Sequence, residues 1–200
     1  MYPFFESICL INGIPRNLEY HQKRLVATFN RFYPGTKCLN LYTIVQDIPV
    51  SNYNEVHKLK ISYNYYSFEY NTQPYAQRKH KKFIINQIMD IQYSHKYSDR
   101  SFFKLAKAKA LPDTEILFYS NNQFTDSTYS NLIFLKNNQW LTPKSYLLNG
   151  CMRQFLLDQK IISETTISFE DLPKCSGFKL INSMNSLEEA IEYPIDLIMK

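Results

Sequence analysis

Three residues that could bond or bind a ligand lie on a predicted helix or directly before one. Lys96 precedes a helix in a polar segment, and a desolvated lysine amine can attack a carbonyl carbon. Arg24 lies on an earlier helix, where its guanidinium can bind a phosphate or a carboxylate. Gly150 directly precedes a third helix, whose first N–H groups can approach an anion. Each of these residue types can do chemistry of this kind, and the three lie far apart in the sequence.

Each candidate also has an ordinary structural explanation. Lys96 could be a surface lysine, as Lys104 on the following helix is expected to be. Arg24 could be a solvent-facing arginine of an amphipathic helix, and Gly150 a turn glycine. Asp126 begins an Asp-Ser-Thr run that is good turn material. Residue spacing alone leaves these alternatives open.

The composition predicts a globular chain. The 200 residues are 44% hydrophobic and 16% aromatic, which excludes collagen-like, mucin-like and generally disordered proteins. The longest apolar runs, such as residues 83–85, are strand-sized, whereas a membrane-spanning helix needs about 20 residues. Only five residues precede Glu6, too few for a signal peptide, so we expect a cytoplasmic protein.

The four cysteines are widely spaced and form no CxxC pair; they are Cys9, Cys38, Cys151 and Cys175. The spacing therefore predicts neither a disulfide framework nor a zinc site. We expect reduced thiols and no metal.

The chain has a formal net charge of +5, and its densest basic cluster is residues 78–82. The cluster lies between two apolar segments, where a run of charges is usually a solvated face. Because no RNA-binding or DNA-recognition motif accompanies it, we do not expect a nucleic-acid partner.

Hydrophobic periodicity and turn residues predict the elements of the first half of the chain. A strand enters the turn dipeptide Asn12-Gly13, and an amphipathic helix from Leu18 ends at Pro34-Gly35. The remaining predicted elements are a weaker helix near 39–46 and strands at 58–63, 65–70 and 82–88.

The second half begins with a helix that Pro112 terminates and continues as a meander of strands. The predicted elements are a helix at 101–110, strands at 115–119, 124–126, 131–135 and 140–142, a helix at 152–159, and short segments at 179–182 and 193–198. The shift in composition suggests a division near residue 85. We expect a small N-terminal α+β lobe, residues 1–85, and a larger β-rich lobe, residues 86–200, that carries Lys96.

Seven segments occur in an order that resembles the fold-type IV pyridoxal-phosphate enzymes, the class IV aminotransferase family. Within that family they are most similar to the aminodeoxychorismate lyases. The matching segments are Phe5-Glu6-Ser7-Ile8, His21-Gln22-Lys23-Arg24-Leu25, residues 95–101 with Lys96 and Asp99-Arg100-Ser101, residues 124–131 with Thr125-Asp126 and Asn131, Trp140-Leu141-Thr142-Pro143, Gly150-Cys151-Met152-Arg153-Gln154, and Ile181-Asn182-Ser183-Met184. Together they span nearly the whole chain.

The resemblance implies pyridoxal 5'-phosphate as the cofactor and assigns roles to the matching residues. Lys96 would be the catalytic lysine that bonds the cofactor aldehyde, and Asp126 would keep the pyridine nitrogen protonated. Arg24 would bind the phosphate together with backbone N–H groups that follow Gly150 and a turn near the C-terminus; these belong to Cys151, Met152 and Ser183.

Further roles follow from the same resemblance. Asn131 would orient the turn that carries the cofactor-binding aspartate, and Arg100 would brace the lysine segment or reach a substrate carboxylate. Tyr97 and Met184 would line the substrate pocket. His21 is better explained as a packed, hydrogen-bonded helix histidine than as a catalytic group.

The sequence departs from the family pattern in three places. It begins almost at the first matching strand, so the early strand and glycine-rich loop of the family are missing. Asp126 stands where most members have glutamate, and its shorter side chain would have to sit closer to the ring. Cys151 replaces isoleucine or threonine, a change that a backbone role should tolerate.

The resemblance implies a two-lobed α+β fold like that of D-amino-acid aminotransferase, shortened at the N-terminus, and a homodimer. It implies a lyase that converts 4-amino-4-deoxychorismate, a small-molecule substrate, to 4-aminobenzoate and pyruvate in folate biosynthesis. Two alternatives remain open: an aminotransferase acting on a D- or branched-chain amino acid, and a non-catalytic protein of the same fold.

Overall fold

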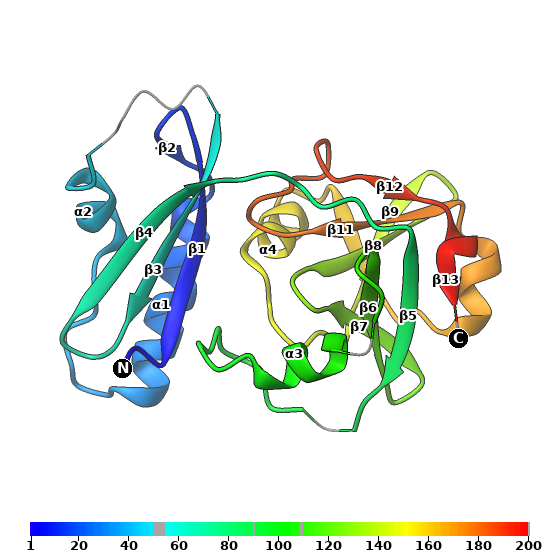
Figure 1. Cartoon of the computed structure of the whole chain (residues 1–200), viewed down its shortest axis with the longest axis horizontal. Helices are drawn as coiled ribbons and strands as arrows, with labels where there is room; N and C mark the ends of the chain where they lie inside the picture. The colour runs from blue at the N-terminus through cyan, green and yellow to red at the C-terminus, as the bar shows by residue number, and fades with distance from the viewer. Residues whose placement is uncertain (50–54, 90, 109, 200) are drawn as a thin grey trace. The chain divides into compact units, whose positions relative to one another are not determined.

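The computed structural model describes residues 1–49, 55–89, 91–108 and 110–199, and the chain forms two compact units. The first unit comprises Met1–Gln77 and His95–Asp99, and the second comprises Arg78–Ser94 and Arg100–Lys200. Both units mix helices with sheets, as the predicted α+β class requires (Figure 1). None of the helices among the described residues is long and apolar enough to cross a membrane.

The division differs from the expected one near residue 85. The chain passes into the second unit at Arg78, and residues 95–99 return to the first unit. They return because the Phe5 N–H donates to the Lys96 carbonyl at 3.1 Å and the Ser98 N–H donates to the Pro3 carbonyl at 2.8 Å. Lys96, expected in the larger lobe, therefore belongs by its contacts to the first unit.

The first unit is a four-stranded antiparallel sheet in the order β2-β1-β3-β4 with two helices. Asn12 and Gly13 both have positive φ, 51° and 78°, which confirms the predicted turn between β1 and β2. The elements are β1 (Phe4–Ile11), β2 (Ile14–Pro15), α1 (Leu18–Phe32), α2 (Leu41–Gln46), β3 (Val56–Tyr63) and β4 (Phe68–Pro74).

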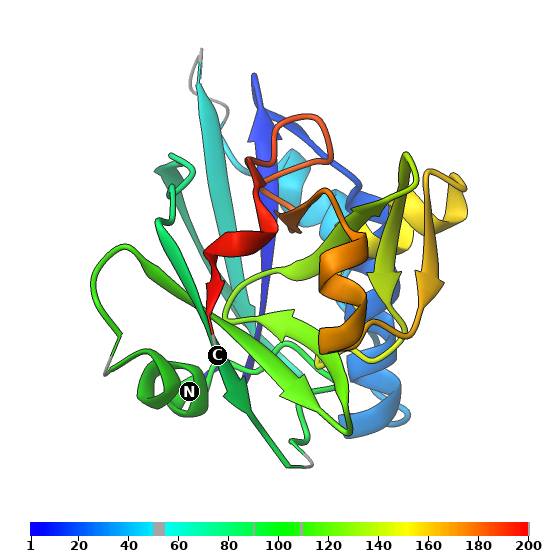
Figure 2. The same cartoon turned by 90° about the vertical axis from the view of Figure 1, so that its right-hand side faces the viewer.

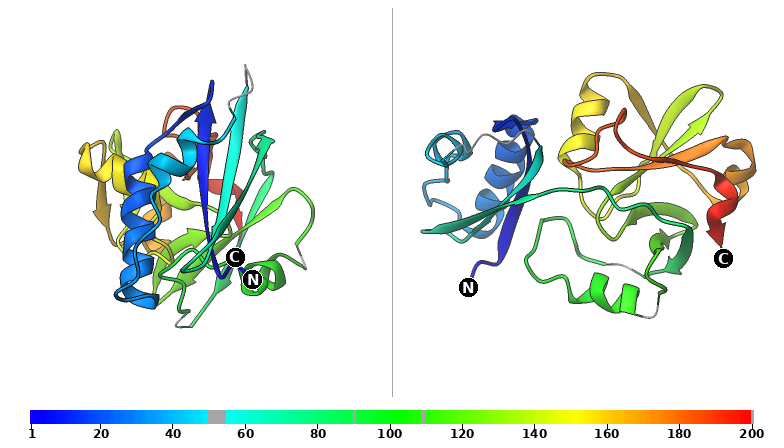
Figure 3. Two further views of the ribbon diagram at one scale, coloured as in Figure 1. Left: turned by 90° about the vertical axis from the view of Figure 1, so that its left-hand side faces the viewer. Right: turned by 45° about the horizontal axis from the view of Figure 1, so that its top comes forward.

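Helix α1 runs along one face of this sheet (Figure 3). The predicted apolar stripe comprises Leu18, Leu25, Phe29 and Phe32. The first three are buried against alternate residues of β1 and β3, whereas Phe32 is 38% exposed. Those strand residues are Phe4, Ile8, Leu10, Leu59, Ile61 and Tyr63. Two polar side chains that α1 turns inward, His21 and Arg24, meet Glu6 on the same face of β1.

The strand predicted at 65–70 begins later than expected. The Asn64 side-chain oxygen accepts hydrogen bonds from the N–H groups of Tyr66 and Ser67, at 3.0 and 2.9 Å. This asparagine turn holds residues 64–67 outside the sheet, so β4 starts at Phe68.

The second unit contains a sheet in the order β10-β9-β8-β7-β6-β5-β13, and β11 pairs with both β8 and β12. Figure 2 shows its C-terminal strand β13, in red, beside β5. The elements are β5 (Lys82–Gln87), α3 (Ser101–Ala108), β6 (Thr114–Ser120), β7 (Gln123–Ser127), β8 (Asn131–Lys136), β9 (Gln139–Pro143), α4 (Cys151–Asp158), β10 (Ile162–Thr165), a short helix Phe169–Lys174, β11 (Gly177–Ile181), β12 (Glu192–Tyr193), a short helix Ile195–Leu197 and β13 (Ile198–Met199).

The predicted meander is confirmed in β6 to β9, whose successive strands are antiparallel. Asn121-Asn122 and Asn137-Asn138 form its outer turns with φ between 48° and 60°, a conformation that asparagine tolerates. Strand β5 pairs with β6 in parallel, and α3 connects them; β9 pairs with β10 in parallel, and α4 connects them. The helix predicted at 101–110 ends at Ala108, and Lys109 lies outside the described residues.

Candidate active site

Asp126 is a buried carboxylate held by three hydrogen-bond donors. It lies on β7 opposite Asn131 of β8, whose side-chain nitrogen donates to Asp126 Oδ1 at 2.8 Å. The N–H groups of Leu147 and Leu148 both donate to Asp126 Oδ2 at 2.9 Å. Burial raises the pKa of Asp126 to about 6, although the three donors and the charge of Arg153 pull it down.

The donor pattern leaves one oxygen of Asp126 able to bind something more. Oδ2 accepts two hydrogen bonds, the usual number for a carboxylate oxygen, whereas Oδ1 accepts one. A carboxyl with a pKa of about 6 is mostly ionised at pH 7. Asp126 can therefore accept a further hydrogen bond from a cationic N–H through Oδ1.

Gly150 keeps Asn131 in place. The Asn131 side-chain nitrogen also donates to the Leu148 carbonyl at 2.9 Å, so one amide ties the carboxylate of Asp126 to the segment before α4. A Cβ atom added at Gly150 would lie 2.1 Å from Asn131 Oδ1, far inside any real contact. The position of the Asn131 side chain therefore requires glycine here, whether or not the start of α4 also binds an anion.

We expect Gly150→Ala to destabilise the protein by roughly 1–3 kcal/mol, because the methyl group displaces Asn131 and breaks its bond to Asp126. The free energy of unfolding in urea measures this cost. The matched control is the same change in an Asn131→Ala background, where the clashing oxygen is gone and Gly150→Ala should cost much less. An equal cost in both backgrounds would contradict the proposed contact.

The other predicted phosphate-binding positions lie at one helix start and one turn. Cys151 and Met152 are the first two residues of α4, and both side chains are buried, so backbone N–H groups are what they can offer a ligand. Ser183 and Met184 form the turn after β11, in which the Met184 N–H donates to the Asn182 side-chain oxygen at 2.8 Å. The Asn182 amide nitrogen donates to Ser130 Oγ at 2.9 Å, tying this turn to the one that follows Asp126.

In the first unit Arg24 belongs to a buried cluster with Glu6 and His21. Arg24 Nε donates to Glu6 Oε1 at 2.9 Å, and Arg24 Nη2 donates to Glu6 Oε2. His21 Nδ1 lies 2.6 Å from Glu6 Oε2, in agreement with the interpretation of His21 as a packed, hydrogen-bonded residue. Burial would raise the pKa of Glu6, but the charge of Arg24 and the hydrogen bonds from His21 and Arg24 lower it to about 2. Glu6 thus fixes the orientation of the Arg24 guanidinium.

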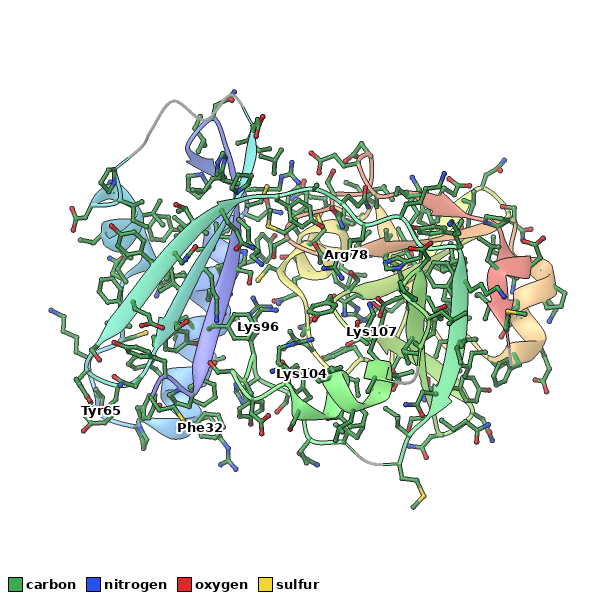
Figure 4. All side chains as sticks on the ribbon, in the orientation of Figure 1. Phe32, Tyr65, Arg78, Lys96, Lys104 and Lys107 are labelled. Atoms are coloured by element: carbon green, nitrogen blue, oxygen red, sulfur yellow. The ribbon has the colours of Figure 1, made fainter. Side chains whose placement is uncertain are left out.

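Lys96 extends over an aromatic surface at the start of β1, where Figure 4 labels it. Its Nζ lies 5.0 Å from the centre of the Phe5 ring, and its side chain is half-buried. The neighbouring Tyr97 pairs with Phe4, with ring centres 5.3 Å apart, and the His95 ring packs edge-on against Phe32. These contacts hold the lysine segment against β1.

The alternative lysines have different surroundings. Lys104 is exposed on α3, and Lys107 Nζ lies 2.8 Å from Glu115 Oε2 in an ion pair (Figure 4). Burial thus separates Lys96 from Lys104, but not from Lys107, which is also half-buried and lies over a ring, 5.9 Å from the centre of Tyr129.

Arg100 braces the turn that follows Asp126. Its Nη1 donates to the Tyr93 hydroxyl at 2.8 Å and its Nη2 donates to the Thr128 carbonyl. The guanidinium also lies over the Phe103 and Tyr129 rings, 4.4 and 4.7 Å from their centres. These contacts brace the turn after Asp126, so the two roles expected for Arg100, bracing the lysine segment and reaching a substrate carboxylate, stay predictions.

The family model for class IV aminotransferases matches residues 3–188. The chain belongs to the class IV aminotransferase family. An uncharacterized protein from Haemophilus influenzae is 34% identical over 189 residues, which are 94% of this chain and 100% of that protein. A crystal structure from Haemophilus somnus 129PT, provisionally named a 4-amino-4-deoxychorismate lyase, has a TM-score of 0.88 at 33% identity and covers 94% of this chain and 98% of its own.

Class IV aminotransferases depend on pyridoxal phosphate. A hypothetical aminotransferase from Mycobacterium tuberculosis in its PLP-bound form shares the fold, with a TM-score of 0.75 at 15% identity over 96% of this chain and 80% of its own. The residues of this chain fit the cofactor, because Asp126 offers a buried, ionisable oxygen with an acceptor position to spare. Its shorter side chain, noted as a departure from the family, is held in place by Asn131 and two backbone N–H groups.

Two buried residues of this class IV aminotransferase were quoted in the sequence motifs but given no role. Glu6 shares the inward face of β1 with apolar residues, and this alternation in the sequence could have indicated that Glu6 is buried.

Arg153 is 1% exposed. It donates to the Pro143 carbonyl at 3.0 Å and to the Asn149 side chain at 3.2 Å, and it forms an ion pair with Glu164. It anchors the segment whose N–H groups hold Asp126, a role that depends on partners distant in sequence.

We expect Glu6→Gln to reduce the free energy of unfolding at pH 7 by about 3–5 kcal/mol, because it leaves Arg24 buried without its carboxylate. The pKa of Glu6 is lowered in the folded state, so the stabilisation is complete above its ordinary value of 4.5 and is lost as the pH falls to about 2. Urea unfolding at pH 7, 5 and 3 should show the two proteins converging only in acid. Glu19→Gln, an exposed change on α1, is the control and should change little.

Proposed function

We propose that this chain is a pyridoxal-phosphate-dependent lyase that converts 4-amino-4-deoxychorismate to 4-aminobenzoate and pyruvate, a step in folate biosynthesis. The observation that carries the proposal is the buried, ionisable Asp126 with its open acceptor position, in a chain whose lysine segment matches the family. The provisional name of the Haemophilus somnus protein, which is 33% identical over 98% of its length, supports the lyase over other family activities.

Lys96 is the proposed catalytic residue. When bound, pyridoxal phosphate supplies an aldehyde that bonds an amine and a ring that takes up charge from the reacting carbon. Lys96 would hold the cofactor by bonding that aldehyde through Nζ. Its neutral Nζ would also be the base that takes the proton from the substrate carbon bearing nitrogen.

The remaining residues hold the cofactor. Asp126 would hold the pyridine end of the cofactor and keep its ring nitrogen protonated; Oδ1, which accepts from Asn131 alone among the described residues, could take that N–H. Arg24, oriented by Glu6, binds the phosphate. Further N–H groups come from the start of α4 and the turn after β11, at Cys151, Met152 and Ser183.

The chemistry of the substrate favours a simple site. Removal of one proton is coupled to cleavage of the ether C–O bond, the enolpyruvyl group leaves as pyruvate, and the substrate ring becomes aromatic. Because aromatisation drives the step, the protein needs mainly to place one base at one face of the substrate. We propose that Tyr97 and Met184 line the substrate pocket.

The test is a direct comparison of substrates. The purified protein should be yellow and should release pyruvate from 4-amino-4-deoxychorismate, but no keto acid from D-alanine or leucine. Keto-acid release would establish the alternative, an aminotransferase, which would use the same Lys96, Arg24 and Asp126. A protein that never takes up the cofactor would contradict both activities.

We also propose a homodimer, as the resemblance to the family implies. Sedimentation equilibrium of the cofactor-loaded protein should give twice the mass of the 23.8 kDa chain. A monomer at micromolar concentration would contradict this.

A further inference from the structure

Two lysines of the first unit lie over the same aromatic ring. Lys60 Nζ lies 5.1 Å from the centre of the Phe5 ring, and Lys96 Nζ lies 5.0 Å from it. The two nitrogens are therefore separated by at most about 10 Å. Each ammonium gains from the electrons of the ring, but the two repel each other.

The fold brings them together from the two sides of β1. Phe5 pairs with Ser62 of β3, and Ser7 pairs with Lys60, so Lys60 is the diagonal neighbour of Phe5 on one face of the sheet. Lys96 adds to the opposite edge of β1, where its carbonyl accepts from the Phe5 N–H at 3.1 Å. The ammonium groups of both lysines thus lie over the ring of Phe5.

Lys60 has a like-charged neighbour, Lys58, on the same face of β3. Burial and the charge of Lys60 lower the pKa of Lys58. On β4, Lys58 pairs with the uncharged Gln73 and Lys60 with the uncharged Asn71. Lys60 forms no ion pair with any of the residues that the structure describes.

Acids and other titratable groups also surround the lysine segment. On β1, Glu6 is paired with Arg24 and His21 of α1. On β4, Glu69 is exposed opposite Ser62. The segment itself carries His95, Tyr97 and the exposed Asp99. Burial and the charge of Arg31 lower the pKa of His95. None of these acids forms an ion pair with Lys60 among the described residues.

We propose that Lys60 acts through Lys96: its charge, held on the shared Phe5 ring, favours the neutral form of the Lys96 amine. That form is the one that bonds an aldehyde and accepts a proton, so the functional meaning of the inference rests on the proposed function of Lys96. At 10 Å the repulsion should lower the pKa of Lys96 by roughly 0.3 in a medium like bulk water and by roughly 1.2 at an effective dielectric constant of 20.

The test is the pH dependence of acetylation of Lys96 by acetic anhydride in the full-length protein freed of cofactor, followed by mass spectrometry of its peptide. In Lys60→Gln the midpoint for Lys96 should rise by roughly 0.3 to 1.2. Lys60→Arg keeps the charge and should leave the midpoint unchanged. Lys37→Gln removes the same charge from an exposed site elsewhere in the first unit and should also leave it unchanged.

Salt provides a second check, because about 0.5 M sodium chloride should shrink the difference between wild type and Lys60→Gln. An unchanged midpoint in Lys60→Gln, or the same rise in Lys60→Arg, would overturn the proposal. Borohydride fixation of the cofactor is a separate measurement. If it labels a lysine other than Lys96, the proposed function fails, while the acetylation midpoint still decides whether Lys60 acts on Lys96.

Discussion

Replacing Lys96 with alanine should abolish turnover and leave the protein unable to hold pyridoxal phosphate covalently. Positioned acid–base groups contribute about 10²- to 10⁴-fold to enzymatic rates, and loss of the covalent link to the cofactor adds to this. We therefore expect pyruvate release from 4-amino-4-deoxychorismate to fall at least about 10³-fold. The visible absorbance of the bound cofactor should shift toward that of the free aldehyde. Borohydride should no longer attach the cofactor to any peptide.

The matched controls are the lysines of α3. Lys104→Ala removes an exposed amine, and Lys107→Ala removes one paired with Glu115, so neither should change the absorbance or the borohydride label. The urea midpoint of each variant, measured alongside, shows whether any loss of activity comes from unfolding. Cofactor label or full activity surviving in Lys96→Ala would reject the assignment of this residue.

Features set by neighbouring residues could be predicted from the sequence. The apolar stripe of α1, the Asn12-Gly13 turn and the paired asparagines of the meander each depend on a few adjacent side chains, and the structure contains them where expected. The family motifs likewise lie within short segments. The start of β4 was misplaced because one side chain, that of Asn64, competes with the strand for two backbone N–H groups.

Features set by distant partners could not be predicted. The lysine segment joins the first unit through backbone hydrogen bonds with Pro3 and Phe5, which leave no periodic pattern in a polar segment. The sequence predicts Arg153 as an ordinary helix arginine, because its partners, the Pro143 carbonyl and the Glu164 carboxylate, are distant in sequence. Gly150 reads as a helix-start glycine, whereas its contact with Asn131 becomes visible only when β8 and α4 are positioned. The sequence therefore predicts candidate site residues without the contacts that fix them in the fold.

Asp126→Asn should lower the rate of pyruvate release by about 10²- to 10³-fold, the usual cost of removing one fixed electrostatic group from an active site. At pH 7 the carboxyl, with a pKa of about 6, carries a charge that in the proposed function keeps the ring nitrogen protonated, and asparagine carries none. The substitution also disturbs the local hydrogen bonds. If the new amide oxygen accepts from Leu147 and Leu148, its NH₂ group faces the NH₂ group of Asn131, donor against donor.

Asp126→Glu separates the charge from the local geometry, because glutamate is the residue that most of the family has at this position. It restores the negative charge, and we expect it to keep activity within about tenfold of wild type if charge is what the site requires. Steady-state pyruvate release measures both variants, and urea unfolding at pH 7 reports the cost of the donor conflict in Asp126→Asn separately. If Asp126→Asn were as active as wild type, the carboxylate would have only a structural role. If Asp126→Glu were as inactive as Asp126→Asn, the three fixed donors, rather than the charge, would be the limiting feature.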